Sequence, residues 1–459
     1  MSEARVYRDQ VLEVEPTGIE HVRDDQRHGS PRHLFGVWFS ANAEIATWMV
    51  GLIIAASYGT DLRSAAAGIL IGNLAGFAVL GALATMGPRY GVPQMVAGRL
   101  AFGRSGNVAP ATLSFLAGVG WFAINTVFGA YALQTIAGWP YPAALGVMLA
   151  LQILIAVYGY NFIHLFERAS VVLLAFGFLI LGVVTFSHVQ WNAPFNPLAP
   201  AAGGGPLAGF VFATALAFSY ALGWVPCASD YSRYLPSTTS ARAVWWYSFL
   251  GCVVSCVVLE IMGAATVTAV SHGSALTNML PTQAVSVLLR SGWVAKLVLF
   301  AVVLGTLTAN CMNLYSGALA ALVAFNIRVK RAAAALAVGV LGALLATGGA
   351  VWSDMATYYT NFLLLLSYWA SPWAAVVLVD LWLRGRSQAD PERAPRWRTG
   401  IVAWIAGLLA STPFWNQAWF VGPVAHAYPQ LGDVSYYVGF VVAGALTALL
   451  RRAESVKFA

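Results

Sequence analysis

The feature that most limits how this chain can fold is a series of long apolar runs separated by short polar segments. A helix that spans a bilayer needs about 20 mostly apolar residues, and twelve such runs occur along the 459 residues. They cover residues 34–58, 64–87, 108–137, 142–160, 169–188, 207–228, 243–270, 293–325, 332–351, 355–381, 400–416 and 434–450. Only 9% of the residues are charged, against roughly 25% in soluble proteins. The sequence therefore predicts an all-α polytopic membrane protein with twelve transmembrane helices, and excludes a soluble enzyme or a nucleic-acid-binding domain.

The basic residues orient the predicted helices. When the N-terminus is placed in the cytoplasm, 22 of the 25 Lys and Arg residues fall on the cytoplasmic side, and only Arg63, Arg290 and Lys296 fall on the other. Cytoplasmic loops of membrane proteins carry such an excess of Lys and Arg. We therefore expect a multi-pass protein of a bacterial-type inner (plasma) membrane, with both termini in the cytoplasm.

The spacing of the runs divides the chain without leaving room for a large soluble domain. We expect a flexible cytoplasmic tail over residues 1–33, because this segment is polar and charged. The following parts are a ten-helix core (34–381), an Arg-rich cytoplasmic loop (382–399), two accessory helices (400–450) and a cytoplasmic tail (451–459). The function must therefore reside among the helices.

Two of the predicted helices are interrupted by small, polar or helix-breaking residues. The first helix carries Gly36, Ser40 and Asn42, and the sixth carries Ser219, Tyr220, Gly223, Trp224 and Pro226. Proline cannot donate the backbone hydrogen bond of a helix, and glycine leaves helical geometry at little cost. Breaks in the first and sixth helices are typical of transporters with two inverted five-helix repeats, here residues 34–188 and 207–381. The alternative interpretation is a pair of kinks with no ligand.

The third helix places Trp121, Asn125 and Phe128 on one face, because they are four and seven residues apart. An aromatic plane beside an amide is suited to a flat heterocycle, since the ring can stack and the amide can read its polar edge. Alternatively, Trp121 packs in the core and Asn125 bonds a neighbouring helix, which is common for asparagine in membranes.

The eighth helix contains Thr306, Thr308, Asn310 and Asn313. Two amides three residues apart are neighbours on a helix and indicate a polar cavity. Threonine hydroxyls and backbone carbonyls are suitable oxygen ligands for a small cation. The alternative is hydrogen bonding between helices.

Glu44 and Glu260 are the two carboxylates that the predicted spans place well inside the membrane. Ionisable residues at that depth are costly and usually functional. Glu44 follows Asn42 closely, so we consider it a candidate for proton coupling. The alternative is a structural partner for a polar group on another helix, and Glu260 is expected only to brace the seventh helix.

Several motifs in one order resemble the purine/cytosine permeases of the nucleobase–cation symport family. They are EPTGI (15–19), VWFSAN (37–42), GP..GVPQMVAGRLAFG (87–103), GWFAIN (120–125), ASDYSRYLP (228–236) and NLYSGAL (313–319). The fungal-type purine–cytosine branch looks most similar. The resemblance implies a leucine-transporter-like fold with a 5+5 inverted repeat, broken helices 1 and 6, and alternating access around a site at the membrane midplane.

The resemblance also implies roles for individual residues. Trp121 would stack on a nucleobase, Asn125 would hydrogen-bond it, and Trp224 would form a second aromatic wall, with Tyr220 as its competitor. The remaining substrate-binding candidates are Asn310, Asn313, Ser40, Asn42 and Phe128.

For the coupling cation, the resemblance implies a site formed by the carbonyls of Gly36 and Phe39 together with Thr308. Gly305 and Ala309 offer no side-chain oxygen where relatives can offer one, which weakens the assignment of Na⁺. We therefore slightly favour H⁺, with Glu44 as its carrier. No cofactor is expected beyond the coupling ion, and no metal beyond a sodium ion.

These features predict a secondary active transporter that imports a purine or cytosine by cation symport, and not an enzyme. Hydantoin, allantoin, a thiamine-precursor pyrimidine and pyridoxine are alternative substrates, because all are flat heterocycles with polar edges. A receptor that binds without transport, or a channel, is a less favoured alternative. The expected partners are the small-molecule base, the coupling cation and the lipid bilayer, and the chain is expected to function as a monomer.

Overall fold

The computed structural model describes residues 13–270, 279, 281–290, 292–327, 329–349, 355–385 and 389–457. Its first α-helices are α1 (Arg32–Asn42), α2 (Ile45–Ala56), α3 (Leu62–Ala84), α4 (Met86–Tyr90), α5 (Gln94–Ala97), α6 (Arg99–Phe102), α7 (Val108–Ala137), α8 (Tyr141–Tyr158) and α9 (Tyr160–His188). They are followed by α10 (Gly205–Trp224), α11 (Ala241–Ala269), α12 (Pro281–Leu288), α13 (Trp293–Phe325), α14 (Arg331–Gly349), α15 (Met355–Arg384), α16 (Gly400–Ser411), α17 (Pro423–Ala427) and α18 (Ser435–Lys457).

Short elements connect these helices. The 3₁₀ helices are η2 (Asp24–Gln26), η3 (Ala202–Gly204), η4 (Val225–Cys227), η6 (Pro391–Arg393), η7 (Thr412–Phe414) and η8 (Pro429–Leu431). Strands β1 (Asn416–Gln417) and β2 (Phe420–Val421) form a small antiparallel hairpin, with Asn416 opposite Val421 and Gln417 opposite Phe420.

Within the described residues, nine helices are long and apolar enough to cross a membrane, and the bent pair α1–α2 brings the number to ten. These ten correspond to the predicted core. The two predicted accessory helices are shorter apolar helices, Gly400–Phe414 and Ser435–Arg451. The structure therefore confirms a polytopic helical architecture. Of the twelve predicted spans, ten are long and apolar enough to cross a membrane within the described residues.

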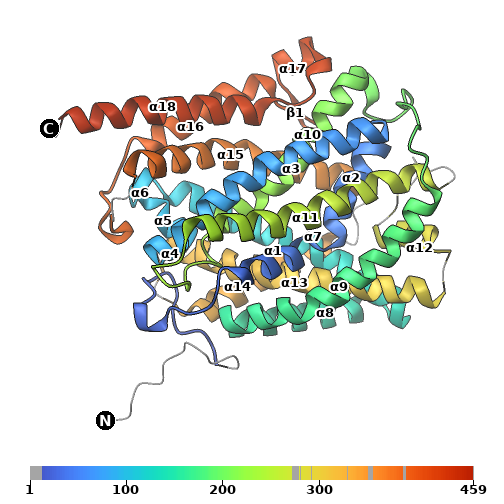
Figure 1. Cartoon of the computed structure of the whole chain (residues 1–459), viewed down its shortest axis with the longest axis horizontal. Helices are drawn as coiled ribbons and strands as arrows, with labels where there is room; N and C mark the ends of the chain where they lie inside the picture. Colours follow the sequence, from blue (N-terminus) through green and yellow to red (C-terminus); the bar gives the residue numbers. More distant parts are fainter. Residues whose placement is uncertain are drawn as a thin grey trace.

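The long helices lie side by side in one bundle (Figure 1). α7 packs extensively on α13, α3 on α10, and α2 on α11. The N-terminal segment before α1 and the C-terminal end of α18 lie at the same end of the bundle (Figure 1).

Glycines allow α3 to approach α10 closely. Gly68, Gly72 and Gly76 follow one another at intervals of four residues, so they share one face of α3. A Cβ atom at Gly72 would lie 2.5 Å from the carbonyl oxygen of Thr214, and one at Gly76 would lie 2.4 Å from the Cβ of Ala221. Small residues at such intervals are the usual means of bringing membrane helices together.

The segment before α1 differs from the flexible tail that we expected over residues 1–33. Residues 1–12 lie outside the described part, but Glu15 is fully buried. Its carboxylate accepts hydrogen bonds from Arg233 (2.7 Å), Tyr234 (2.6 Å) and Tyr315 (3.0 Å), and Arg331 lies 3.2 Å away. A buried charge is tolerated when it is paired and hydrogen-bonded, so this acidic residue anchors the segment to the bundle.

Two other predicted boundaries also differ. The predicted gap between residues 160 and 169 is helical, because the turn lies at Gly159 (φ 90°) and α9 begins at Tyr160. The predicted tail 451–459 continues α18 as far as Lys457, with residues 458–459 outside the described part. Residues 386–388 of the Arg-rich loop and residues 350–351 of the ninth predicted span also lie outside it.

Candidate functional site

The first membrane span is broken between α1 and α2, as the sequence predicts. The chain bends by 57° between the two helices, and Glu44 has an extended backbone at the bend (φ −137°, ψ 166°). Asn42 donates from Nδ2 to the carbonyl oxygen of Trp38 (2.8 Å), and Thr47 donates to that of Asn42 (2.6 Å). The Thr47 hydroxyl thus gives the carbonyl oxygen of Asn42, the last residue of α1, a partner at the break.

The sixth span is interrupted differently. α10 ends at Trp224 and passes into the 3₁₀ helix η4, where Pro226 lies, and then into turns. The α-helical hydrogen bonding therefore stops where Pro226 predicts, but no sharp bend divides α10.

Tyr220 of α10 reaches the break in the first span. Its hydroxyl lies 2.6 Å from Oγ1 of Thr47 and donates to Oε1 of Glu44 at 3.1 Å. Glu44 is fully buried, and its Oε2 has no hydrogen-bond partner among the residues that the structure describes. Two chain segments about 175 residues apart, at Glu44 and Tyr220, thus meet at one carboxylate.

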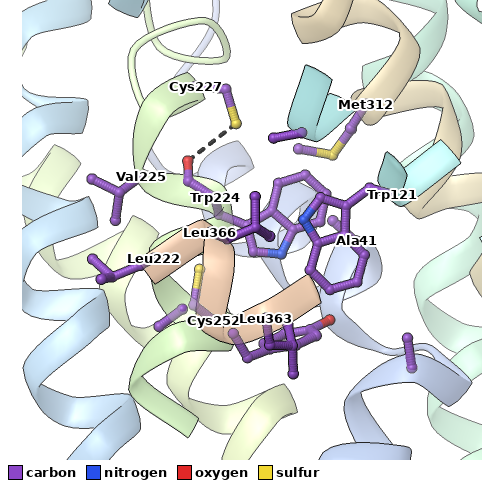
Figure 2. Packing of buried hydrophobic residues seen from close by; sticks show 14 of the residues in the cluster. Ala41, Trp121, Leu222, Trp224, Val225, Cys227, Cys252, Met312, Leu363 and Leu366 are labelled. Carbon is purple, nitrogen blue, oxygen red and sulfur yellow. Dashed lines mark hydrogen bonds between the residues drawn. The ribbon is translucent and has the colours of Figure 1, made fainter. Parts of the chain in front are cut away.

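Aromatic rings surround this point, and we call the group formed by Trp121, Tyr220, Trp224, Tyr359 and Phe362 the aromatic chamber. The indole of Trp121 makes edge contacts with Tyr220, Tyr359 and Phe362, at centroid distances of 5.6, 6.0 and 5.2 Å. Figure 2 shows Trp121 and Trp224 among buried side chains of several helices. Two of the residues predicted to contact a heterocycle therefore lie in one buried region.

Gly223 explains how Trp121 comes so close to α10. A Cβ atom at this position would lie 3.1 Å from Nε1 of Trp121. Since that separation is tighter than an ordinary van der Waals contact, a larger residue would displace the indole. Gly223 was predicted as a helix breaker. In the structure, its lack of a side chain leaves room for the indole of Trp121.

Asn125 lies one turn after Trp121 on α7 and is fully buried. Its side chain is close enough to interact with Glu44, yet neither its Oδ1 nor its Nδ2 has a hydrogen-bond partner within the described ranges. A buried amide without partners is costly, so a ligand with a polar edge would satisfy it.

Asn310 and Asn313 have different surroundings. Asn310 donates from Nδ2 to the carbonyl oxygen of Phe122 (2.9 Å) and to Oγ1 of Thr126 (3.0 Å), so it fastens α13 to α7. Asn313 donates to Oδ1 of Asn310 at 3.2 Å. The interpretation of Asn310 as an interhelical hydrogen-bonding residue is therefore the one that its contacts favour.

Ser40, Asn42 and Phe128 each contact other groups of the protein. Ser40 donates its hydroxyl to the carbonyl oxygen of Glu167 (2.9 Å), and Asn42 uses its amide within the break. Phe128 is fully buried, and its ring lies 6.4 Å from that of Tyr359, centroid to centroid.

Thr308, one residue of the predicted cation site, joins α13 to α1. Thr308 donates to the carbonyl oxygens of Ser40 (3.1 Å) and Gly305 (2.8 Å), and a Cβ at Gly305 would lie 2.6 Å from the carbonyl oxygen of Ala43. Thus Thr308 and Gly305 of α13 lie against the carbonyl oxygens of Ser40 and Ala43. The side chain of Phe39 lines an apolar groove between α1, α9 and α11, and a Cβ atom at Gly36 would lie 3.8 Å from Cγ of Arg168.

Glu167 of α9 is a buried carboxylate that the sequence prediction missed. It is fully buried, and neither of its carboxylate oxygens has a hydrogen-bond partner in the described part of the chain. It was missed because the polar residues after Gly159 suggested a loop. Glu260, in contrast, accepts a 2.7 Å hydrogen bond from Asn73 and braces α11 against α3, as predicted.

The broken first span, the buried carboxylates and the aromatic chamber define a class of protein, a polytopic secondary transporter. A family model described as "Permease for cytosine/purines, uracil, thiamine, allantoin" matches residues 21–439. The chain belongs to this family, whose members are permeases and not enzymes.

Comparisons with individual proteins agree with this assignment. YxlA of Bacillus subtilis, named as a purine-cytosine permease, is 28% identical and covers 96% of both chains. The purine-cytosine permease fcyB of Emericella nidulans is 28% identical, covering 97% of this chain and 90% of its own. Among solved structures, the fold is similar to that of Mhp1, with a TM-score of 0.73 and 20% sequence identity. Mhp1 is a nucleobase-cation-symport-1 family transporter, solved in a closed conformation with bromovinylhydantoin bound. The alignment covers 95% of this chain and 94% of Mhp1. The fold is therefore leucine-transporter-like.

Proposed function

We propose that this protein imports a purine or cytosine-like nucleobase together with a cation, by alternating access. The observation that carries the proposal is Asn125, a fully buried amide beside Glu44 and one turn from Trp121. Within the described residues, neither of its two polar side-chain atoms has a hydrogen-bond partner of good geometry. A nucleobase offers a flat ring for the indole and a mixed donor and acceptor edge for the amide. YxlA and fcyB are named as purine-cytosine permeases, which supports this substrate class.

Another flat heterocycle is the second candidate. Mhp1 has been solved with bromovinylhydantoin bound, and an indole with one amide would also suit a hydantoin ring. A thermal-stabilisation screen of bases and hydantoins, each with and without Na⁺, tests both candidates, because a ligand that binds only the native state raises its apparent stability. The proposal expects a purine or cytosine to give the largest shift, and a screen in which only hydantoins stabilise the protein would favour the second candidate.

We favour H⁺ as the coupling ion. Thr308 contributes the only side-chain oxygen among Gly305, Thr308 and Ala309, and Glu44 lies at the break beside Tyr220. A buried carboxylate is a natural proton carrier when its ionised form has few partners.

The choice of ion leads to a prediction for uptake in intact cells. A protonophore should abolish accumulation of labelled base, whereas replacing Na⁺ by choline should leave it unchanged. Glu44→Gln should retain exchange of base across the membrane but lose accumulation against a gradient, since the amide cannot carry the proton. Glu20→Gln, an exposed carboxylate before α1, is the matched control. Uptake that requires Na⁺ in full would overturn the assignment.

Asn313 gives a prediction for affinity. Asn313→Ala should weaken base binding by roughly 1–3 kcal/mol, the cost of losing a hydrogen bond at a buried site. Asn192→Ala, which changes an exposed asparagine outside the bundle core, should leave the dissociation constant unchanged. Isothermal titration with the purified protein measures both, and equal affinities for the Asn313 variant and the parent would remove Asn313 from the site.

We further propose that the protein functions as a monomer in a plasma membrane, with both termini in the cytoplasm. The excess of Lys and Arg on one side supports this orientation. The position of the N-terminal segment and of the end of α18 at one end of the bundle is consistent with it (Figure 1).

A further inference from the structure

A hollow of about 950 Å³ lies where the segment before α1 meets the ends of several helices. Its other walls come from α6 and the start of α7, from the connection between α13 and α14, and from η6 and the segment after it. Among the described residues, its lining includes no member of the aromatic chamber but five basic side chains, which are Arg99, Arg104, Lys330, Arg331 and Arg396. We call this cavity the basic hollow.

Acidic side chains balance only part of the charge of the basic hollow. Two carboxylates, those of Glu20 and Glu392, line it within the described ranges. The Glu20 carboxylate accepts a 2.7 Å hydrogen bond from the backbone nitrogen of Gly18, and Arg331 is paired with Glu15 at 3.2 Å. Four basic side chains therefore remain beside two acidic ones, which leaves a surplus of positive charge that an anion would neutralise.

Backbone contacts hold two of these basic residues at fixed positions. Arg104 donates its backbone N–H to the carbonyl oxygen of Pro395 at 2.8 Å. Ser105 donates its own N–H to that of Arg396 (2.8 Å), and Nε of Arg396 donates to Oγ of Ser105 (3.3 Å). Gly103, with φ 79°, allows this close approach, because a Cβ atom there would lie 2.8 Å from the carbonyl oxygen of Arg396. One wall of the hollow is therefore already in place before a ligand arrives.

An exposed, mainly apolar stripe leads from the basic hollow along α7. Val108 lines the hollow, and Val108, Thr112 and Leu116 share one face of α7, because they are four residues apart. Val108 is 40% exposed and Leu116 is 53% exposed, while Thr112 donates its hydroxyl to the carbonyl oxygen of Val108 (2.9 Å). Since α7 is long and apolar enough to cross a membrane, this α7 stripe is suited to contact with lipid acyl chains.

We propose that the basic hollow binds the phosphate headgroup of an anionic phospholipid, whose acyl chains lie along the α7 stripe. Guanidinium groups form strong, charge-assisted hydrogen bonds with phosphate oxygens, and basic pockets between the ends of membrane helices are suited to such headgroups. A free phosphate shares the headgroup chemistry, but it would make no use of the exposed apolar side chains beside the hollow. The volume is at the upper end of the roughly 300–1,000 Å³ usual for small-molecule sites, which suits the two phosphates of a cardiolipin headgroup.

Cardiolipin is therefore the probe for the first measurement. Thermal unfolding of the purified full-length protein, in a detergent with an uncharged headgroup and at constant ionic strength, is followed as the lipid is added. Cardiolipin should raise the Tm until the shift saturates, because a ligand that binds the native state stabilises it by mass action. Phosphatidylcholine with matched acyl chains carries no net charge and should give a much smaller shift.

A double variant locates the effect in the basic hollow. Arg104→Gln combined with Lys330→Gln removes two exposed basic side chains from opposite walls. Each basic residue near an anionic headgroup contributes about five-fold in affinity, so the variant should need at least about ten-fold more cardiolipin for the half-maximal shift. Arg32→Gln combined with Arg242→Gln removes the same charge from exposed positions outside the hollow. This control should respond to cardiolipin like the parent.

Inorganic phosphate distinguishes a lipid headgroup from a free anion. A saturable shift with cardiolipin that the hollow variant weakens and the control variant keeps supports the proposal, whether or not phosphate also raises the Tm. A shift with phosphate and none with cardiolipin would assign the hollow to a free anion and overturn the lipid. Equal shifts with cardiolipin and phosphatidylcholine, or equal losses in the two double variants, would also overturn it. The comparison of the two lipids uses the unaltered protein, so it does not depend on how well a variant folds.

Discussion

Replacing Trp121 by alanine is expected to abolish uptake of labelled nucleobase while the protein remains folded. Stacking of a base on an aromatic side chain contributes about 1–3 kcal/mol, and the indole of Trp121 is held by edge contacts with Tyr220, Tyr359 and Phe362. Loss of the indole should therefore remove both affinity and orientation of the base. Uptake by cells that express the variant gives the first measurement.

The same ring also fills space, so folding must be measured separately. Truncation of a buried tryptophan typically lowers stability by about 3–5 kcal/mol, and thermal unfolding of the purified variant reports this loss. Trp121→Phe keeps a stacking surface and should retain reduced uptake. Trp382→Ala removes an exposed tryptophan at the end of α15 and should transport like the parent. Undiminished uptake by a folded Trp121→Ala variant would show that Trp121 does not stack on the base.

Glu15→Gln is expected to lower the free energy of unfolding by about 3 kcal/mol, because removing one partner of a buried ion pair leaves the other charge uncompensated. The charges left behind belong to Arg233, which is fully buried, and Arg331, which is nearly so. The hydroxyls of Tyr234 and Tyr315 would keep an acceptor in the amide oxygen, so part of the hydrogen bonding survives. Denaturant unfolding in detergent measures the change.

The control lies in the same segment. Asp25 forms an ion pair with Arg23 at 2.6 Å, and both side chains are largely exposed. Exposed pairs contribute little, so Asp25→Asn should unfold at the same denaturant concentration as the parent. If Glu15→Gln also unfolds there, the segment before α1 does not depend on this carboxylate.

The membrane spans were largely predictable, because a bilayer demands long apolar helices and the sequence shows where they occur. The break in the first span was also predictable, since Ser40 and Asn42 interrupt an apolar run. The start of α9 was misplaced because Asn161, His164 and Glu167 look like loop residues. The signal that marks the true turn is Gly159, whose positive φ favours glycine.

The site was predictable in part. The spacing of Trp121 and Asn125 on one helix predicts a shared face, and the structure brings Tyr220 and Glu44 to the same region. The roles of Asn310 and Ser40 were not predictable, because a polar side chain on a buried helix can face either a cavity or a neighbouring backbone. Only the packing of α13 against α1 and α7 decides between them.

The burial of Glu15 could not be inferred from its neighbours in the sequence. Its partners Arg233, Tyr315 and Arg331 lie more than 200 residues away in the sequence. Only the tertiary structure therefore shows that the charged segment before α1 packs against the helix bundle.

The central claim is that this protein moves a nucleobase against its gradient by coupling to a cation. The most direct measurement is uptake of labelled adenine or cytosine by proteoliposomes, with either a proton gradient or a sodium gradient imposed across the membrane. We predict that an inward proton gradient drives the internal base concentration above the external one, and that a protonophore returns it to equality. Base that only equilibrates under both gradients, or does not enter at all, would contradict the account.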